Sequence, residues 1–458
     1  MTVDMGTLQL RLERALTAWV PWQRWYGSKG RPPHGASIVG TTAFSDTLRT
    51  GGARGVLLLL RVTFADGGPP EYYQVPVGMR AVLALELEPY VIAGVDDLFV
   101  YEAVGDSALV GALLGLTGAR SVPPGTSRPL GVEQTHTSVV VDERYLLKIF
   151  RRISTGTNPD VELLRALGAT ANPHVTGLRG AVEGELDGEP VTYAMVQDYL
   201  PEATDGFTAA CAAVAACAAA STGAATSTGT SASTGAAHQG AFVPEARAMG
   251  EAVARVHADL ARRLGTAPTG AAELAALRRD LAADLDEAAR RVPALRPLRP
   301  AVRAAYERLA VLASGPPAQR VHGDLHLGQL LRSSTGWILV DFEGAPGVPL
   351  AERRARHSPL SDIAGMLRSF DYAARCAGVP DTGRWTARCA DAFCDGYARV
   401  SGLDPREHTL LLRACVLARA VHEVVYEHDH RPERTSLPLA AVAELAQHGH
   451  LNSGNQAW

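Results

Sequence analysis

The chain has 458 residues and 47% of them are hydrophobic, so two or three subdomains can share a sizeable core, and a disordered protein is excluded. The formal net charge of −4 gives no support for a general nucleic-acid binder. The six cysteines form no CxxC pair, which indicates free thiols in a reducing compartment. No secretory leader and no apolar run of about eighteen residues occurs, so we expect a cytoplasmic protein without a membrane span.

The first 90 residues predict a small α+β unit. Thr7–Val20 has the apolar spacing of an amphipathic helix, and Val56–Phe64 and Glu71–Pro76 have the composition of strands. The segment Pro21–Arg31 places two tryptophans and a tyrosine among basic side chains. We interpret this segment as a packed aromatic anchor, while a cap near a bound ligand stays an alternative.

Residues 91–200 predict strands around one informative lysine. Val139–Val141 and Tyr145–Phe150 are strand-like and flank a short polar turn, and Lys148 lies inside the second of them. A buried ammonium needs a counter-charge, because an unpaired one is very costly. Glu162 follows Asn158-Pro159, a helix-start signal, and is the predicted partner of Lys148.

The remainder, residues 201–458, is predicted to be mostly helical. The stretch Ser221–Gly235 consists of Ala, Ser, Thr and Gly only, which predicts a dispensable flexible loop. Val243–Leu264 and Ala271–Val292 have the leucine spacing of long helices.

The most informative motif is Val321–Gln329, which reads VHGDLHLGQ, followed by the apolar run and acidic end of Leu339–Glu343. Phosphoryl transfer from a nucleotide needs one carboxylate at the acceptor hydroxyl, and another carboxylate with an amide at the metal. Asp324 fits the first role, and Asp341 with Gln329 fits the second. We therefore predict a phosphotransferase that uses ATP and Mg²⁺.

These motifs resemble the aminoglycoside-phosphotransferase-like kinases, with Gln329 where that family usually has Asn. One branch of that family, the actinobacterial maltokinases and glucosamine kinases, has sequences similar to this chain in four segments, which are residues 323–329, 341–344, 349–354 and 358–374. The resemblance implies an α+β, bilobal protein-kinase-like fold. It implies a cap over residues 1–90, a kinase N-lobe over 91–200, and a helical C-lobe over 201–458 with the catalytic loop.

The resemblance also implies roles for individual residues. Asp324 would orient or accept the hydroxyl proton, and Lys148 with Glu162 would meet the ATP phosphates. In the segment Gln134–Ser138, the hydroxyls of Thr137 and Ser138 could contact phosphate oxygens. The strand Thr192–Pro201 would be the hinge that binds adenine, with Gln197, Met195 and Tyr199 beside the ring. Glu343 could hold a second metal or cap a turn, and both readings stay open. His322 and His326 are expected to be structural, and Asp362 could anchor the loop.

The acceptor side is predicted on the helix-like segment Val421–Pro432. His422, Tyr426 and Asp429 share one helical face there, and Glu423 and Glu427 share another. Asp371 is added by the resemblance. The segment Glu433–Thr435 lacks the tryptophan of the maltokinase pattern, and its neighbours bring extra carboxylates, which favour a cationic sugar. A solvated polar face is the alternative reading.

The leading hypothesis is therefore an ATP-dependent kinase that converts D-glucosamine to glucosamine 6-phosphate. A maltokinase that makes maltose 1-phosphate is the alternative, and a nucleotide-binding pseudokinase is the hypothesis from another class. The expected partner is a small sugar, with no nucleic acid and no membrane, and we expect a monomer or weak dimer.

Overall fold

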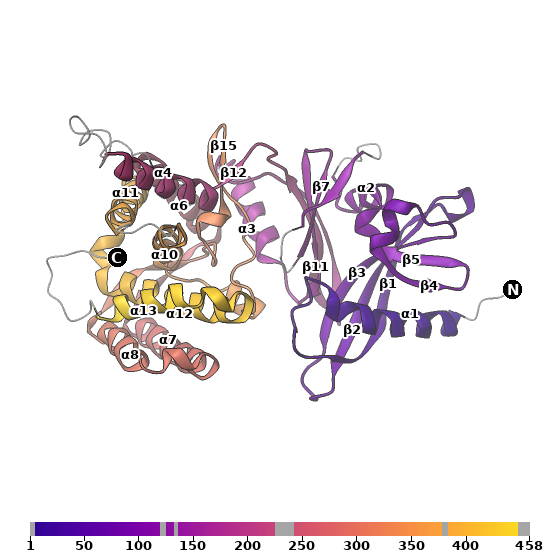
Figure 1. Ribbon diagram of the computed structural model, residues 1–458, viewed down its shortest axis with the longest axis horizontal. Coiled ribbons are helices and arrows are strands. Elements are labelled where there is room, and N and C mark those ends of the chain that lie inside the picture. The colour runs from indigo at the N-terminus through magenta and orange to yellow at the C-terminus, as the bar shows by residue number, and fades with distance from the viewer. Residues whose placement is uncertain (1–4, 120–124, 132–135, 225–241, 378–382, 448–458) are drawn as a thin grey trace. The chain divides into compact units, whose positions relative to one another are not determined.

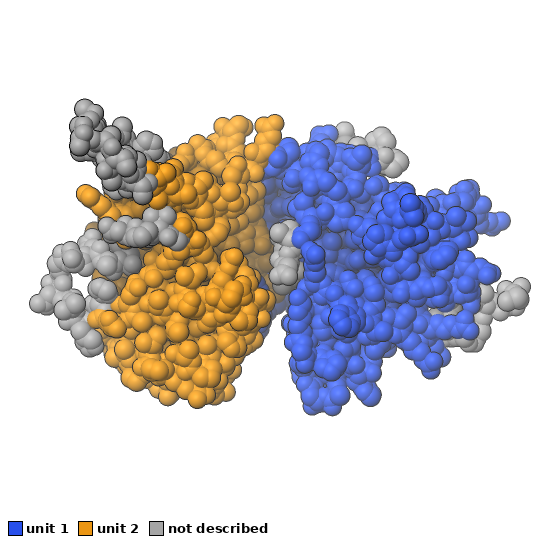
Figure 2. Space-filling view, in the orientation of Figure 1, with its two compact units in different colours: residues 1–165, 176–201, 346–352 blue, residues 166–175, 202–345, 353–458 orange. Residues whose placement is uncertain are grey.

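The computed structural model describes residues 5–119, 125–131, 136–224, 242–377 and 383–447. The chain divides into two compact units, which Figure 2 shows in different colours. Unit 1 comprises residues 1–165, 176–201 and 346–352, and unit 2 comprises residues 166–175, 202–345 and 353–458. Strands dominate the first unit and helices dominate the second.

The elements of the strand-rich part are α1 (Met5–Trp19), β1 (Pro33–Asp46), β2 (Arg54–Phe64), β3 (Glu71–Arg80), β4 (Val91–Val95), β5 (Leu98–Glu102), α2 (Ser107–Leu116), β6 (Ser127–Pro129), β7 (His136–Val141), β8 (Tyr145–Phe150), β9 (Arg152–Ile153), α3 (Pro159–Gly168), β10 (Leu178–Leu186) and β11 (Glu189–Asp198). They build two antiparallel sheets, which Figure 1 shows with α1 and α2.

The first sheet has the order β1-β2-β3-β5-β4, and β9 pairs with β3. Alternate residues of β2, from Val56 to Phe64, are buried in the same core as Leu12 and Leu16 of α1. Every second side chain of a strand points to the same face of the sheet, and this face of β2 is the covered one. The predicted helix and the two predicted strands are confirmed, although β3 runs four residues further than expected. The sheet also continues past residue 90, since β4 and β5 belong to it.

The second sheet has the order β10-β11-β8-β7-β6. Strands β7 and β8 form a hairpin in which Val141 pairs with Tyr145, and the short connection between them places Asp142 and Glu143 at positive φ. In this sheet Lys148 lies between Ser138 of β7 and Met195 of β11. The lysine is therefore held in the middle of the sheet.

The elements of the helical part are β12 (Thr204–Asp205), α4 (Gly206–Ala224), α6 (Val243–Leu264), β13 (Thr266–Gly270), α7 (Ala271–Arg291), α8 (Arg299–Glu307), β14 (Ser314–Gln319), β15 (Leu330–Ser333), β16 (Gly336–Leu339), α9 (Leu350–Arg353), α10 (Leu360–Cys376), α11 (Gly383–Ser401), α12 (Thr409–His430) and α13 (Ser436–Gln447). The helices predicted at Val243–Leu264 and Ala271–Val292 are confirmed as α6 and α7.

Close helix packing in unit 2 depends on glycine. A Cβ on Gly250 of α6 would lie 2.1 Å from the carbonyl oxygen of Phe393, and one on Gly396 of α11 would lie 2.1 Å from that of Arg247. The two backbones therefore approach each other at contact distance. Helix α10 packs against α12, and α12 packs against α13 (Figure 1).

Part of the low-complexity prediction can be compared with the structure. Helix α4 continues to Ala224, so the first four residues of the predicted loop Ser221–Gly235 are helical, because alanine is the strongest helix former. Residues 225–235 lie outside the described residues. All six cysteines are free thiols, as predicted. Among the described residues, no helix is both long and apolar enough to span a bilayer.

Candidate active site

The loop that carries Asp324 is held by a buried carboxylate of α10. Asp362 is 2% exposed and accepts hydrogen bonds from the backbone N–H groups of His322 (2.7 Å) and Gly323 (2.9 Å). A third bond, of 2.9 Å, joins Asp362 to Nε2 of His257, whose Nδ1 lies 3.0 Å from the hydroxyl of Tyr397. Burial alone would raise the pKa of Asp362, but the bond to His257 and the neighbouring charges lower it, so the carboxylate stays ionised. The expected anchoring by Asp362 is thus what the contacts show.

Helix α10 also contacts the loop through its backbone. A Cβ on Gly365 would lie 2.1 Å from the carbonyl oxygen of Leu325, so only glycine allows this approach. One turn further on, the hydroxyl of Ser369 accepts a 3.1 Å hydrogen bond from the backbone N–H of Leu327. The backbone of the catalytic loop therefore contacts α10 at four positions, namely His322, Gly323, Leu325 and Leu327.

Two histidines of the motif make scaffold contacts. His322 donates from Nε2 to the carbonyl oxygen of Val340 (2.9 Å), and its ring packs 4.7 Å from that of Phe342. Nδ1 of His326 accepts a 3.1 Å bond from the backbone N–H of Gly328. Burial lowers the pKa of His326 to about 4, so the imidazole is neutral near pH 7 and its Nδ1 lone pair stays available.

The side chain of Asp324 meets a cation that the sequence did not reveal. Nη1 of Arg419, on α12, lies 2.6 Å from Oδ1 of Asp324, and the two side chains are 21% and 14% exposed. Arg419 lies three residues before His422, on the helix predicted to face the acceptor. Arg419 shares a helix face with Glu423, because residues four apart lie on one side of a helix, but this spacing does not indicate a contact with Asp324.

Two of the predicted metal ligands lie just outside a pair of strands, Gln329 before β15 and Asp341 after β16. Leu330 of β15 pairs with Leu339 of β16, which brings Gln329 and Asp341 close together at the open end of this hairpin. Nε2 of Gln329 lies 3.2 Å from Oδ2 of Asp341. Asp341 has φ of 67°, which is unusual for a residue with a side chain. This bend follows the end of β16 at Leu339, so the strand does not continue to Glu343.

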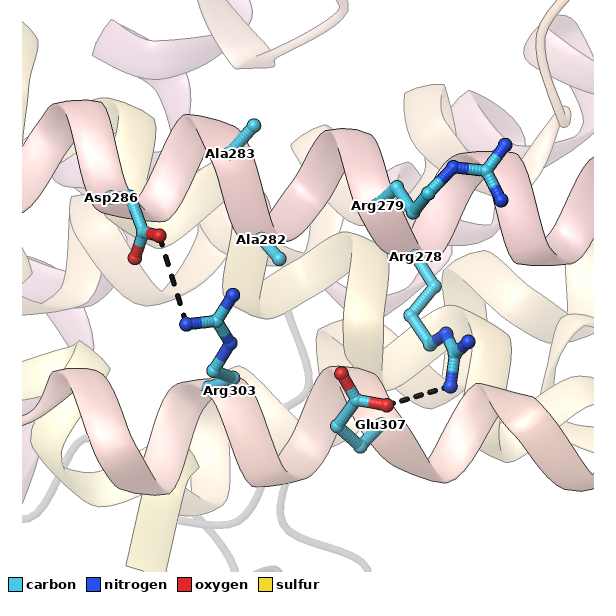
Figure 3. Close-up of a pocket in the computed structure, with 7 residues that line it drawn as sticks. All are labelled: Arg278, Arg279, Ala282, Ala283, Asp286, Arg303 and Glu307. Carbon is cyan, nitrogen blue, oxygen red and sulfur yellow. Dashed lines mark hydrogen bonds and ion pairs between the residues drawn. The ribbon is translucent and has the colours of Figure 1, made fainter.

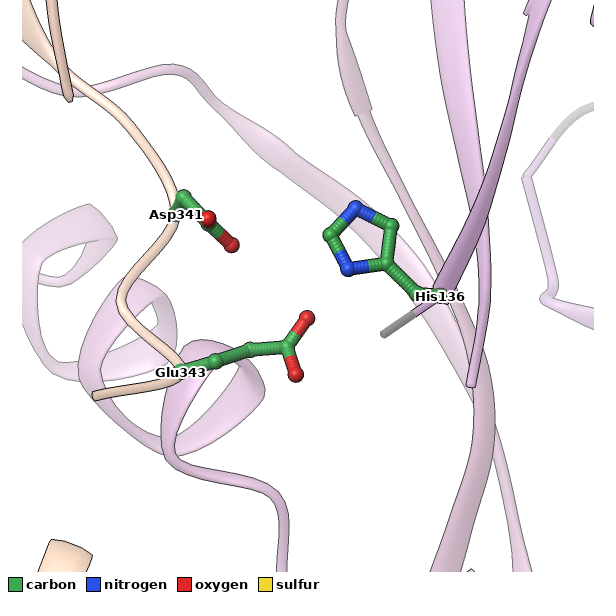
Figure 4. A group of neighbouring side chains, drawn as sticks. All are labelled: His136, Asp341 and Glu343. Atoms are coloured by element: carbon green, nitrogen blue, oxygen red, sulfur yellow. The ribbon is translucent and has the colours of Figure 1, made fainter. Parts of the chain in front are cut away.

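Glu343 nevertheless lies near Asp341. A carboxylate oxygen of each lies within 4.8 Å of one of the other, and Figure 4 shows both on the segment after β16, with His136 of β7 labelled as well. The backbone carbonyl of Glu343 accepts a 2.9 Å bond from Arg353. Carboxylate and amide oxygens are the ligands that Mg²⁺ prefers, so Gln329, Asp341 and Glu343 fit that ion.

Lys148 in unit 1 pairs with an acid that the sequence analysis did not single out. Its Nζ lies 2.6 Å from Oδ2 of Asp160, and both side chains are almost fully buried. Asp160 stands at the second position of α3, where its backbone N–H bonds to Oδ1 of Asn158. The predicted Glu162 lies two residues later, about 200° around the helix, and is half-buried. Asn158-Pro159 correctly predicted the start of α3, but it did not indicate that Asp160 contacts Lys148.

The other predicted nucleotide residues are engaged inside unit 1. Ser138 is opposite Lys148, so it shares that residue's face of the sheet, whereas Thr137 faces the other side and accepts a 2.7 Å bond from Arg151. Gln197 is 2% exposed and accepts a bond from Thr176 (3.1 Å). The hydroxyl of Tyr199 accepts a 3.1 Å bond from Arg128. Met195 is fully buried, and Gln134 and Thr135 lie outside the described residues.

The predicted acceptor residues fall on two faces of α12. Glu423 and Glu427 lie on the packed side, and His422, Tyr426 and Asp429 lie on the solvent side. Arg368 of α10 joins Glu423 (2.7 Å) to Asp371 (2.6 Å). Oε1 of Glu427 accepts bonds from the hydroxyl of Tyr372 (2.9 Å) and from Arg431 (2.8 Å). Asp429 pairs with Arg291 of α7 (2.6 Å), and the ring of Tyr426 stacks on His430. The structure thus brings Glu423 and Asp371 together, and gives Asp429 separate partners.

Comparisons with known proteins identify the family of this chain. The model of the maltokinase N-terminal cap domain matches residues 19–106, and the model of the phosphotransferase enzyme family matches residues 228–403. A glucosamine kinase of Streptacidiphilus jiangxiensis is 33% identical over 75% of this chain and 78% of its own length. The chain belongs to the glucosamine kinase family. A second family member, from Mycolicibacterium smegmatis, is 31% identical over 70% of the chain and 80% of its own length.

The fold of the chain is also similar to that of a solved structure. A solved glucosamine kinase, in complex with glucosamine, ADP and inorganic phosphate, superposes with a TM-score of 0.67 over 97% of this chain and 100% of the other, at 24% identity. The predicted α+β phosphotransferase fold, with strands first and helices after, is therefore confirmed. As a member of the glucosamine kinase family, the chain is a phosphotransferase that acts as a kinase.

A cavity of unit 2 holds none of the predicted site residues of this kinase. It has a volume of about 270 Å³ and lies between α7 and α8 (Figure 3). Four of the five charged residues that line it form pairs, Arg278 with Glu307 at 2.6 Å and Arg303 with Asp286 at 3.7 Å. These side chains neutralise one another, so the chemistry is assigned to the loop of Asp324.

Proposed function

We propose that this protein transfers the γ-phosphoryl group of ATP to the 6-hydroxyl of D-glucosamine, giving ADP and glucosamine 6-phosphate. Membership of the glucosamine kinase family is the observation that carries the choice of sugar. The anchored loop of Asp324 and the Gln329–Asp341 pair support the reaction type.

In the proposed reaction a bond forms between the acceptor oxygen and the γ-phosphorus, and the bond from that phosphorus to the β-γ bridging oxygen breaks. Asp324 orients the hydroxyl and takes its proton, which then passes to solvent. Gln329 and Asp341, with Glu343, would hold Mg²⁺, which would neutralise charge on the phosphates. Lys148 would meet the α- and β-phosphates, while Asp160 supplies the counter-charge in the structure.

The test is a panel of acceptors with ATP and Mg²⁺. Glucosamine, glucose, N-acetylglucosamine and maltose are each assayed for ADP formation, and the product is identified by ³¹P and ¹³C NMR. Acetylation removes the ammonium charge and adds bulk, while glucose has no ammonium that could form a charged hydrogen bond with a carboxylate. One lost charged hydrogen bond costs about 1.5–3 kcal/mol, so we expect a preference for glucosamine of roughly ten- to a hundredfold.

One specific observation favours a second candidate, a maltokinase that makes maltose 1-phosphate. Residues 19–106 match the maltokinase cap model. A clear preference for maltose in the same panel would replace the amino-sugar proposal. Nucleotide binding without turnover of any sugar would support a pseudokinase, which the presence of Lys148, Asp324, Gln329 and Asp341 argues against.

We also propose that the enzyme works in the cytoplasm as a monomer or weak dimer. Sedimentation velocity at micromolar concentration tests the second point, and a stable higher oligomer would contradict it.

A further inference from the structure

The backbone of the catalytic loop and the side chain of Asp324 are held by different helices. Helix α10 fixes the backbone, through Asp362 on the N–H groups of His322 and Gly323 and through the close approach of Gly365 to Leu325. These contacts set the position of the main chain around Asp324. They do not set the rotation of its carboxylate, which depends on two side-chain torsions.

Arg419 of α12 is the cation that contacts this carboxylate among the described residues. Its Nη1 lies 2.6 Å from Oδ1 of Asp324, and neither side chain is more than 21% exposed. A charge-assisted bond of this length between shielded groups is among the stronger polar contacts in proteins. It occupies Oδ1, so Oδ2 is the oxygen left to meet a hydroxyl.

Arg419 is itself restrained by charge. Glu423 lies four residues later on α12 and attracts the guanidinium, while Arg368 binds Glu423 at 2.7 Å. Arg368 is 3% exposed and also binds Asp371 at 2.6 Å. A row of alternating charges therefore runs from Asp324 to α10, through the helix that carries the predicted acceptor residues.

We propose that Arg419 is the positioning residue of the phosphoryl transfer: it fixes the carboxylate of Asp324 so that Oδ2 faces the acceptor hydroxyl. This inference rests on the proposed function, because it assigns Asp324 to the acceptor. Arg419 acts through Asp324. A side chain that only fills space at this place would tolerate a neutral replacement, whereas a positioning cation would not.

The experiment compares Arg419→Met, which keeps the stem and removes the charge, with Arg419→Lys, which restores a single charged donor. Arg413→Met is the matched control: it lies on the same helix, and the structure shows no carboxylate partner for it among the described residues. For each variant we measure kcat, KM for ATP, KM for the sugar and the melting temperature, in the full-length protein.

We expect Arg419→Met to lower kcat roughly 10²-fold, the usual consequence of misplacing a catalytic group by about 1 Å, with KM for ATP changed by less than about threefold. Arg419→Lys should recover about tenfold of that loss, because an ammonium keeps the charge but lacks the planar fork. Arg413→Met should keep the wild-type kcat. A wild-type kcat in Arg419→Met would overturn the proposal. Equal losses in the Met and Lys variants, accompanied by equal falls in melting temperature, would do the same.

The failure of this inference can be told from failure of the proposed function. If the wild-type protein phosphorylates none of the sugars, the proposed function fails before any variant is compared. If the wild-type protein turns over a sugar and Arg419→Met is as fast, only the role of Arg419 fails.

Discussion

Gly365→Ala adds a single methyl group to α10, and we expect it to lower kcat although the methyl group contacts no polar side chain. Gly365 lies inside α10, where alanine is intrinsically favoured over glycine by about 1 kcal/mol. An added Cβ would, however, lie 2.1 Å from the carbonyl oxygen of Leu325. Real Cβ atoms essentially never come within 3.0 Å of such an atom, so helix and loop must separate by about 0.9 Å.

The size of the effect follows from that displacement. Overpacking of a tight contact typically costs about 1–3 kcal/mol, which is larger than the gain in helix propensity, so the free energy of unfolding should fall in Gly365→Ala. Leu325 is adjacent to Asp324, and a shift of about 1 Å in a catalytic group can cost roughly 10²-fold in rate. We therefore expect kcat to fall about 10²-fold, a larger loss than the change in stability alone would cause in a folded enzyme.

The assay is steady-state sugar phosphorylation at a temperature where both proteins are folded, together with urea unfolding. Gly115→Ala is the matched control, since Gly115 is also a helical glycine and an added Cβ there meets nothing within 4 Å. It should keep the wild-type kcat and be neutral or slightly more stable. A wild-type kcat in Gly365→Ala would refute the claim that the contact between α10 and Leu325 sets the position of the catalytic loop.

Two further outcomes follow from the site. Asp324→Asn should abolish turnover while ATP binding, measured by calorimetry, changes little, and near-normal turnover would remove Asp324 from its assigned role. His326 has a pKa of about 4 in the folded protein, below its unfolded value of about 6.5, so protonation favours the unfolded chain. Its contribution to stability is complete above pH 6.5 and is lost as the pH falls towards 4, at most about 3 kcal/mol. Unfolding free energies from pH 7 to 4 should therefore decline more steeply in the wild type than in His326→Gln, and parallel curves would contradict this.

The local patterns of the sequence predicted several helices and strands, and they provided the candidates for the core of the site. Helices α6 and α7 and strand β2 were located within a few residues, because apolar periodicity and strand composition are properties of neighbouring residues. Asp324, Gln329 and Asp341 could be named as candidates because they belong to one short motif, whose loop and hairpin the structure contains.

The partners of charged side chains could not be predicted in the same way. Lys148 meets Asp160, two residues before the predicted Glu162, and this contact depends on the rotation of α3 against the sheet. Arg419 meets Asp324 across 95 positions of the chain, through helix packing that no local pattern records. Ion pairs between distant elements are consequences of the tertiary fold, and the sequence predicts only that a buried charge needs a partner.

The acceptor carboxylates bear on how strongly a cationic sugar can be preferred. Glu423, Glu427 and Asp429 already pair with Arg368, Arg431 and Arg291. An ammonium that joins an existing pair gains less than one that meets an unpaired carboxylate, so the range of about 1.5–3 kcal/mol is an upper limit for one such contact.

Among these pairs, Glu427 combines a buried carboxylate with a cation that can move away, since the two side chains are 4% and 42% exposed. A buried carboxylate is little hydrated, so exchanging Arg431 for a sugar ammonium changes its energy more than at Asp429, whose side chain is 20% exposed. Glu427→Gln keeps an oxygen for the hydroxyl of Tyr372 and should narrow the ratio of kcat/KM between glucosamine and glucose by about tenfold. Asp429→Asn, on the solvent side of the same helix, should leave that ratio unchanged. If both variants shift the ratio equally, or neither does, Glu427 does not recognise the amino group.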